Sequence, residues 1–161
     1  QGQRVYFSWL NKKEQKVKEY IVYANYDPTT GISKMTKSNK YGTFSATAEV
    51  HEEDKDIANR WDGLRFCEFK IDMQSERVRA SIFRERMNGV KNAILSIEPP
   101  DPGEDDYTWD KMMIQYMDLK RRYEESIKRY KQMKSAYHDF ASECLAIRRK
   151  LHQYDAKRTN A

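Results

Sequence analysis

Seven cations lie within fifteen residues near the end of the sequence, where they could bind phosphates or an acidic protein surface. Only two carboxylates, those of Glu124 and Glu125, fall between them. Clustered Lys and Arg residues project a positive potential that attracts negatively charged partners. A solvated outer helix face has a similar composition, so both interpretations stay open. The seven cations are Lys120, Arg121, Arg122, Lys128, Arg129, Lys131 and Lys134.

Five aromatic residues recur at intervals of seven through the same region. An interval of seven equals two helical turns, so the five side chains would lie along one seam of a helix. They could stack on nucleic-acid bases beside the cations, or they could fill a wide space between two packed helices. The strict period favours packing, because stacking on bases requires no such period. The five residues are Trp109, Tyr116, Tyr123, Tyr130 and Tyr137.

Five carboxylates gather in the segment EPPDPGEDD, which precedes the aromatic seam. Its three prolines and one glycine cannot continue an α-helix, so we expect a loop between two helices. A helical hairpin with an acidic tip resembles, in shape and charge, transcription factors that reach into RNA polymerase. Such acids also keep a turn hydrated and cap the helix that follows. The acids of the tip are Glu98, Asp101, Glu104, Asp105 and Asp106.

The chain carries few residues in arrangements that support catalysis or metal binding. No Gly-rich phosphate loop, nucleophile elbow, H-E-x-x-H or C-x-x-C motif occurs in it. Cys67 and Cys144 lack the spacing of a zinc site, and their small number favours a reducing compartment. We therefore expect no enzymatic activity, no cofactor and no metal, although His51 and His152 are expected to lie near each other.

The overall composition suits long helices with one apolar side. Of the 161 residues, 34% are charged and 39% are hydrophobic. The net charge of +5 belongs to the last third, because residues 107–161 hold 13 Lys and Arg against 7 Asp and Glu. No long apolar run and no signal segment occur, which favours a cytoplasmic protein without a membrane partner.

Strand patterns fill residues 1–52 and predict a small antiparallel sheet. The runs RVYFSW, KVKEYIVYANY, ISKMTK and TFSATAEV are separated by turn residues. They predict a four-stranded antiparallel meander. A sheet of this size requires a covering layer, so one face should rest on a helix.

Helical periodicity fills residues 53–161 and predicts a long helical hairpin. The helices should span about 53–97 and 107–157, with the Pro-rich acidic loop 98–106 between them. Two heptad rows on the second helix, broken only by Ser126, predict an antiparallel coiled coil, and Glu76 is a polar exception on the first helix. In that register Cys67 would lie near Tyr137 and away from Cys144, so no internal disulfide is expected. The predicted fold is therefore α+β.

One segment, GTFSATAEVHEEDKDIANRWDGLRFCEFK at residues 42–70, resembles a pattern common in small proteins of bacteriophages and prophages. In that pattern a strand of the form G-x-x-x-A-x-A leads through a His or Pro and several acids into a helix bearing a Gly. The resemblance covers about thirty residues and implies an accessory protein that binds a host or phage nucleoprotein complex, in the host cytoplasm. The matching residues are Gly42, Ala46, Ala48, His51, Glu53, Asp54 and Gly63.

Three functions are compatible with these features. The leading hypothesis is a non-enzymatic phage or mobile-element accessory protein that docks on a nucleic-acid-processing or host-defence nucleoprotein complex, including as an inhibitor. The alternative is a self-assembling coiled-coil scaffold whose heptad seam is the oligomer interface. Direct DNA or RNA binding is a weaker third hypothesis, and a Pro-rich hinge permits a helix-swapped homodimer.

Overall fold

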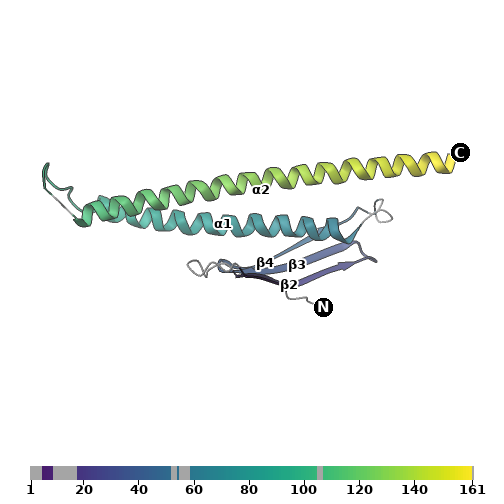
Figure 1. Cartoon of the computed structure of the whole chain (residues 1–161), viewed down its shortest axis with the longest axis horizontal. Coiled ribbons are helices and arrows are strands. Elements are labelled where there is room, and N and C mark those ends of the chain that lie inside the picture. The colour runs from purple at the N-terminus through teal and green to yellow at the C-terminus, as the bar shows by residue number, and fades with distance from the viewer. Residues whose placement is uncertain (1–4, 9–17, 52–53, 55–58, 105–106, 161) are drawn as a thin grey trace. The chain divides into compact units, whose positions relative to one another are not determined.

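The chain forms an antiparallel sheet followed by two helices (Figure 1), so the predicted α+β class is confirmed. The computed structural model describes residues 5–8, 18–51, 54, 59–104 and 107–160. In chain order the elements are β1 (Val5–Ser8), β2 (Lys18–Asp27), β3 (Ile32–Asn39), β4 (Gly42–Glu49), α1 (Arg60–Leu95) and α2 (Tyr107–Asn160).

Packing divides the chain into two compact units. The first unit contains Gln1–Ser75 and Gln132–Ala161, and the second contains Glu76–Lys131. Each helix therefore contributes to both units. The predicted domains, 1–52 and 53–161, divide the chain by secondary structure, and that division stays a prediction.

The sheet of the first unit is an antiparallel meander held by two tight turns. Gly31, with a φ of 72°, closes the turn after β2, and its amide donates to the Asp27 carbonyl at 2.8 Å. At the next turn, the amide of Tyr41 donates to Asn39 Oδ1 at 2.8 Å, and Gly42 has a φ of 137°. Both glycines adopt a backbone region that other residues rarely enter.

The described strand side chains that pack against α1 in the core come from β2, β3 and β4. The prediction was a sheet of four strands. The core consists of Met35 from β3 with Cys67 and Ile71 from α1. Flanking apolar side chains come from β2, from β4 and from the start of α1: Ala24, Phe44, Ala46, Ala48 and Leu64. The predicted first strand corresponds to β1, a four-residue segment that pairs with β2.

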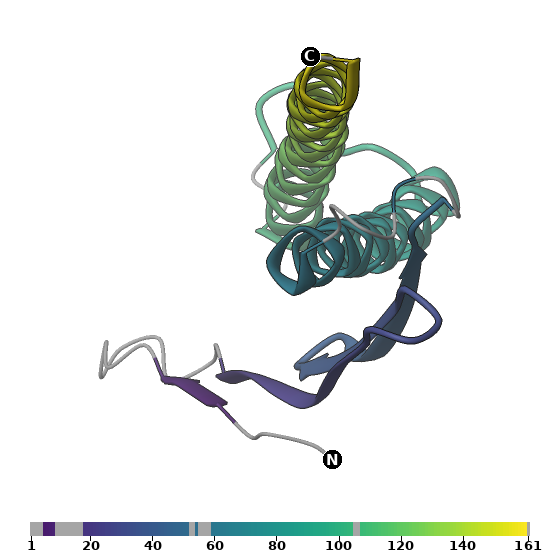
Figure 2. The ribbon, with the colours of Figure 1, turned by 90° about the vertical axis from the view of Figure 1, so that its right-hand side faces the viewer.

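The pattern of burial along β3 shows which face of the sheet packs against α1. Ser33, Met35 and Lys37 alternate along it and are all buried. Side chains alternate between the two faces of a strand, so these three share one face, on which Met35 packs against Cys67 and Ile71 of α1. Figure 2 shows the ribbon of the start of α1 along one side of the sheet. On the opposite face hydroxyls pair with each other, Thr36 with Ser45 at 2.8 Å and Ser38 with Thr43 at 3.1 Å.

Helix α1 approaches β3 closely at Gly63. This glycine is buried, and a Cβ atom placed on it would lie 3.0 Å from Ser33 Cβ and overlap Ser33 Oγ. Gly89, farther along α1, has no heavy atom within 4 Å of the same position. Gly63 is therefore required by packing, which its place in the sequence did not reveal.

Two side chains of α1 donate to backbone carbonyls of β4, the last strand of the sheet. Lys70 Nζ donates to the Thr47 carbonyl at 2.7 Å, and Gln74 Nε2 donates to the Ser45 carbonyl at 3.3 Å. Lys70 and Gln74 are four residues apart on α1, and the two carbonyls that they reach are two residues apart on β4. These bonds supply partners for carbonyls at a sheet edge.

Helix α1 begins at Arg60, several residues after the predicted start near residue 53. Asn59 caps it, because Asn59 Oδ1 accepts a hydrogen bond from the Asp62 amide at 2.9 Å. Asn59 Nδ2 also donates to Asp62 Oδ2 at 3.0 Å, so the two residues form a reciprocal cap. Residues 59–62, N-R-W-D, contain this capping pattern in the sequence.

We expect the substitution Asn59→Ala to lower the free energy of unfolding by about 1 kcal/mol, because it removes the acceptor for an amide of the first helical turn. Urea denaturation followed by circular dichroism measures this change. Asn59→Ser serves as the control, since its hydroxyl keeps an acceptor at the cap without placing a second carboxylate beside Asp62. An alanine variant as stable as the wild type would show that this cap does not stabilise α1.

Aromatic contacts join the two helices within the first unit. Phe66 contacts Tyr137 and Phe140, with ring centroids 5.8 and 4.8 Å apart, and Phe69 contacts the same two rings at 6.1 and 5.6 Å. Residue 67 was predicted opposite the region of residue 137, and its neighbours Phe66 and Phe69 do contact Tyr137, while Cys67 Sγ itself donates to the Ser33 carbonyl at 3.5 Å. Both cysteines are free.

The second unit buries both polar exceptions of the predicted seams. Glu76 is 7% exposed and Ser126 is fully buried. Glu76 Oε2 lies 3.8 Å from Arg79 Nη1, whereas Ser126 Oγ has no hydrogen-bond partner among the described residues. The guanidinium groups of Arg77 and Arg122 lie over Tyr130 and Phe83, at 5.9 and 6.0 Å.

Candidate binding surface on the second helix

The aromatic seam is used for packing in both units. Trp109, Tyr116, Tyr123 and Tyr130 are half-buried in the second unit, beside Leu119 and Ser126, which are buried. Tyr137 is half-buried in the first unit and contacts Phe66 and Phe69. The rings are thus engaged by protein and do not form an open platform for bases.

Two of the seven predicted cations are occupied by carboxylates on their own helix. Arg121 donates to Asp118 and Glu125, both at 2.8 Å, and Arg122 Nε lies 3.0 Å from Asp118 Oδ2. The hydrogen bond from Arg121 lowers the pKa of Asp118, and the bond to Asp118 raises the pKa of Arg121. The sequence interpretation missed Asp118, although its spacing of three and four residues from the arginines is typical of helix ion pairs.

The other predicted cations are exposed and lack ion pairs with any described residue. Lys120, Lys128 and Lys131 are eight and eleven residues apart, spacings that place them on one side of α2 at 3.6 residues per turn. We call these three lysines the basic face. Arg129 points away from them on the helix, and Lys134 belongs to the first unit.

The basic face borders a shallow hollow in the second unit. The hollow has a volume of about 400 Å³ and is lined by α2 residues alone: Tyr123, Glu124, Ile127, Lys128 and Lys131. It combines the edge of a seam tyrosine and an isoleucine with two lysines. Such a surface offers apolar contact together with positive charge, and Glu124 is its one carboxylate.

The acidic loop provides no built site among its described residues. Glu98, Asp101 and Glu104 are exposed, while Asp105 and Asp106 lie outside the described residues. The Glu104 amide donates to the Asp101 carbonyl at 3.0 Å, and Gly103 has a φ of 89°, so the segment forms a turn. No group of three metal-binding side chains occurs in the part of the chain that the structure describes.

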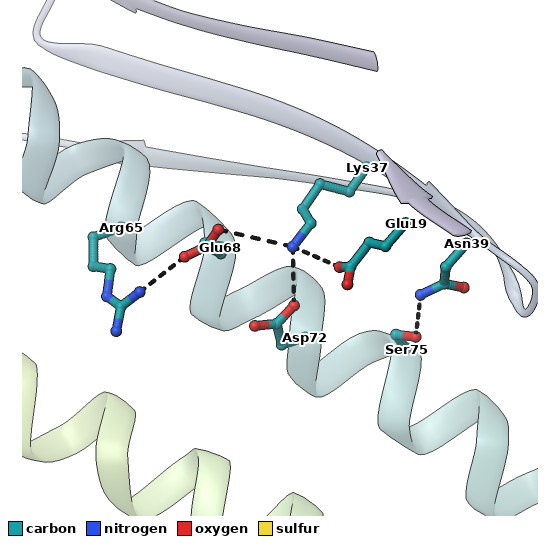
Figure 3. A network of polar contacts seen from close by, with 7 residues as sticks. All are labelled: Glu19, Lys37, Asn39, Arg65, Glu68, Asp72 and Ser75. Carbon is teal, nitrogen blue, oxygen red and sulfur yellow. Dashed lines mark hydrogen bonds and ion pairs between the residues drawn. The ribbon is translucent and has the colours of Figure 1, made fainter. Parts of the chain in front are cut away.

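A buried lysine, which the sequence interpretation missed, lies between the sheet and α1 (Figure 3). Lys37 Nζ lies 2.6 Å from Glu19, 3.4 Å from Asp72 and 3.8 Å from Glu68. Beside it Arg65 donates to Glu68 at 2.9 Å, and Asn39 donates to Ser75 at 2.8 Å. Lys37 and Arg65 thus face three carboxylates, so this group of side chains carries one more negative charge than positive charges.

The surrounding charges keep Lys37 protonated. Burial lowers the pKa of its amine, but the hydrogen bond to Glu19 and the charges of Asp72, Glu19 and Glu68 outweigh burial and raise it. Burial raises the pKa of Asp72, and the attraction of Lys37 only partly opposes this effect. A protonated lysine is not a nucleophile, and Lys37 here is the cation of an ion-pair cluster. The sequence did contain a sign of this cluster, because Lys37 lies two residues after Met35 and therefore on the same, inward face of β3.

A second polar contact, also unpredicted, joins the segment before α1 to the end of α2. Asp54 Oδ1 accepts a hydrogen bond from His152 Nε2 at 2.8 Å, and Arg148 Nη1 lies 3.4 Å from Asp54 Oδ2. His152 was expected beside His51. The described partner of His152 is Asp54, whose amide donates to the His51 carbonyl at 2.9 Å, and the His51 side chain is exposed.

Neither cysteine is an activated thiol. Burial raises the pKa of Cys67, and burial together with the carboxylate of Asp62 raises the pKa of Cys144. A raised pKa lowers the fraction of reactive thiolate at neutral pH. The two cysteines thus contribute to packing.

Comparison with known proteins gives no match to any protein-family model, curated protein or solved structure. The resemblance of residues 42–70 to phage proteins therefore stays a hypothesis. Among the described helices, neither is long and apolar enough to cross a membrane.

Proposed function

We propose that the protein is a non-catalytic binding protein that docks through its basic face on an acidic surface of a nucleic-acid-processing or nucleoprotein complex. The observation that carries this proposal is that Lys120, Lys128 and Lys131 are exposed without ion pairs among the described residues, next to the hollow. Lysines that form no ion pair within the chain do not have to break one when they bind a ligand. The apolar rim of the hollow adds contact area that a purely solvated face would lack.

An acidic protein surface fits this site better than a nucleic acid. Tyr123 and Tyr130 are half-buried, and Tyr130 lies under the Arg77 guanidinium, so these rings are not available for base stacking. Three lysines alone neutralise few phosphates, which makes nucleic-acid binding weak at physiological salt. Direct DNA or RNA binding is therefore the less favoured function.

The proposal has two further parts: how the two helices pack, and the phage or mobile-element source of the protein. The heptad spacing of α2 and the ring contacts with α1 support an antiparallel coiled-coil hairpin as the scaffold of the surface. The resemblance of residues 42–70 supports a phage or mobile-element setting, in which docking would inhibit a host complex. A self-assembling scaffold is less favoured, because packing within each unit already uses the seam.

We expect the triple substitution Lys120→Glu, Lys128→Glu and Lys131→Glu to weaken partner binding by at least tenfold, because it reverses the charge of the basic face. The measurement is retention of partner proteins from a bacterial lysate on the immobilised chain, after nuclease treatment, quantified by mass spectrometry. Thermal stability should be nearly unchanged, since these side chains are exposed.

The matched control reverses three exposed lysines elsewhere, Lys34, Lys40 and Lys91, and gives the same net charge. The control should retain the partner. Equal loss with both triple variants would show that only net charge matters, and capture abolished by nuclease alone would assign binding to nucleic acid. Either result would overturn the proposed docking surface.

A further inference from the structure

The first unit contains a cavity that is lined by the end of β4, the start of α1 and the later part of α2. Its volume is about 120 Å³. An engineered apolar cavity of about 150 Å³ holds benzene, so this cavity has room for one ring or a short branched chain. The apolar residues of its wall are Ala48, Val50, Phe66, Ile147 and Leu151.

The charged residues of the wall are two carboxylates and one guanidinium, those of Glu49, Asp62 and Arg148. Asp62 Oδ2 accepts a hydrogen bond from the uncharged amide of Asn59 at 3.0 Å, and neither carboxylate forms an ion pair with a described residue. Arg148, in contrast, lies 3.4 Å from Asp54 Oδ2, so its charge already has a partner. The wall therefore carries unpaired negative charge.

The charges just outside the wall do not reverse this balance. Asp54 is shared between Arg148 and His152. Burial raises the pKa of the Cys144 thiol in the wall; the nearby charges of Asp62 and Glu143 raise it too, while Arg148 lowers it. The cations that lie close by in the chain but do not line the cavity are Arg60, Arg149 and Lys150, all of them exposed.

An anionic ligand is the competing possibility, because Arg148 Nε is buried and has no hydrogen-bond partner among the described residues. An anion at Arg148 would have to share the guanidinium with Asp54, and it would enter a wall that also contains Glu49 and Asp62. A cation meets two carboxylates without displacing an existing ion pair. The charges of the cavity thus favour a cation over an anion.

We propose that this cavity binds a small organic cation, a primary amine on an apolar body of one ring or a short branched chain. The apolar body contacts Phe66, Ile147 and Leu151, and the ammonium group lies beside Asp62 and Glu49. A charge-assisted hydrogen bond to a carboxylate is roughly twice as strong as a neutral one. This site lies in the first unit and shares no residue with the basic face, so either site can fail without the other.

The test compares three probes of similar shape that differ chiefly in the charge of their end group. They are 2-phenylethylamine, 2-phenylethanol and phenylacetate, which are cationic, neutral and anionic at pH 7. Each probe is titrated into the full chain labelled with nitrogen-15, and the shifts of the amide signals give the Kd. We expect a Kd of about 1 mM or below for the amine, in the range for a ligand of this size. The amine should bind about tenfold more tightly than the alcohol, and the acid should bind most weakly.

The variant Glu49→Gln, Asp62→Asn removes both carboxylates and should reduce the affinity for the amine to about that for the alcohol. The Kd of the alcohol should stay the same, which would show that the cavity is intact. Glu49→Gln alone changes an exposed side chain and keeps the bond between Asn59 and Asp62, so it should fold normally and lose part of the preference for the amine.

The matched control is Glu85→Gln, Glu98→Gln, which changes the net charge equally at two exposed carboxylates of the second unit. The control should keep the full preference for the amine. Four results would overturn the inference: no binding of the amine at about 10 mM, acid binding at least as tight as amine binding, equal loss in the variant and the control, or shifts confined to the second unit.

Discussion

The substitution Gly63→Ala is expected to lower the free energy of unfolding by about 2–3 kcal/mol, although alanine is the better helix former. A Cβ atom at this position would overlap Ser33 Oγ and lie 3.0 Å from Ser33 Cβ. Ser33 is fully buried on β3, so it has little room to yield, and overpacking of this kind costs about 1–3 kcal/mol. Chemical denaturation with linear extrapolation measures the change.

Gly89→Ala is the matched control on the same helix. No heavy atom lies within 4 Å of its added Cβ, and the site is exposed, so the substitution should raise stability by about 1 kcal/mol. The two identical replacements should thus have opposite signs. The double variant Ser33→Gly, Gly63→Ala should recover part of the loss. A stabilising Gly63→Ala would show that α1 does not approach β3 as described.

Removal of Lys37 should be the second large effect, a loss of about 2–3 kcal/mol in Lys37→Ala. The substitution leaves Glu19, Glu68 and Asp72 without their shared cation, and one uncompensated buried charge usually costs 3–5 kcal/mol. We reduce that figure because the carboxylates are 30–39% exposed and water screens them. The loss is measured at pH 7, where Lys37 is charged in both folded and unfolded states.

The control for charge in this cluster is Asp72→Asn, which should raise stability at pH 7 by at most about 1 kcal/mol. The folded-state pKa of Asp72 is raised, so its ionised form costs stability above that pKa. As pH falls toward 3.8, the unfolded value, the folded protein takes up a proton more readily and the cost disappears. The advantage of Asp72→Asn should therefore shrink with acidification. An advantage that grows would contradict the assigned direction.

Long-range periodicity was the part of the fold that the sequence could reveal. Helix α2 spans Tyr107–Asn160, close to the predicted 107–157, because its heptads contain neither Gly nor Pro to interrupt them. The start of α1 was less accurate, since acidic residues before residue 60 were read as a first helical turn. Trp61, in the first turn of α1, is 71% exposed, with Arg60 over its ring.

The missed parts of the polar sites depend on contacts between residues far apart in the chain. Lys37 meets Asp72 across 35 positions, and His152 meets Asp54 across 98. No local pattern encodes either pair. The basic cluster was visible as composition, but its division into paired arginines and unpaired lysines depended on Asp118, just outside the fifteen residues that were counted.

The bonds from Lys70 and Gln74 to β4 have a consequence for behaviour at high concentration. An extended strand from a neighbouring molecule would have to displace both donors before it could pair with the Thr47 and Ser45 carbonyls. Such competition raises the barrier to growth of cross-β fibres from this edge. Helix α1 therefore protects the folded chain against aggregation while it covers the core.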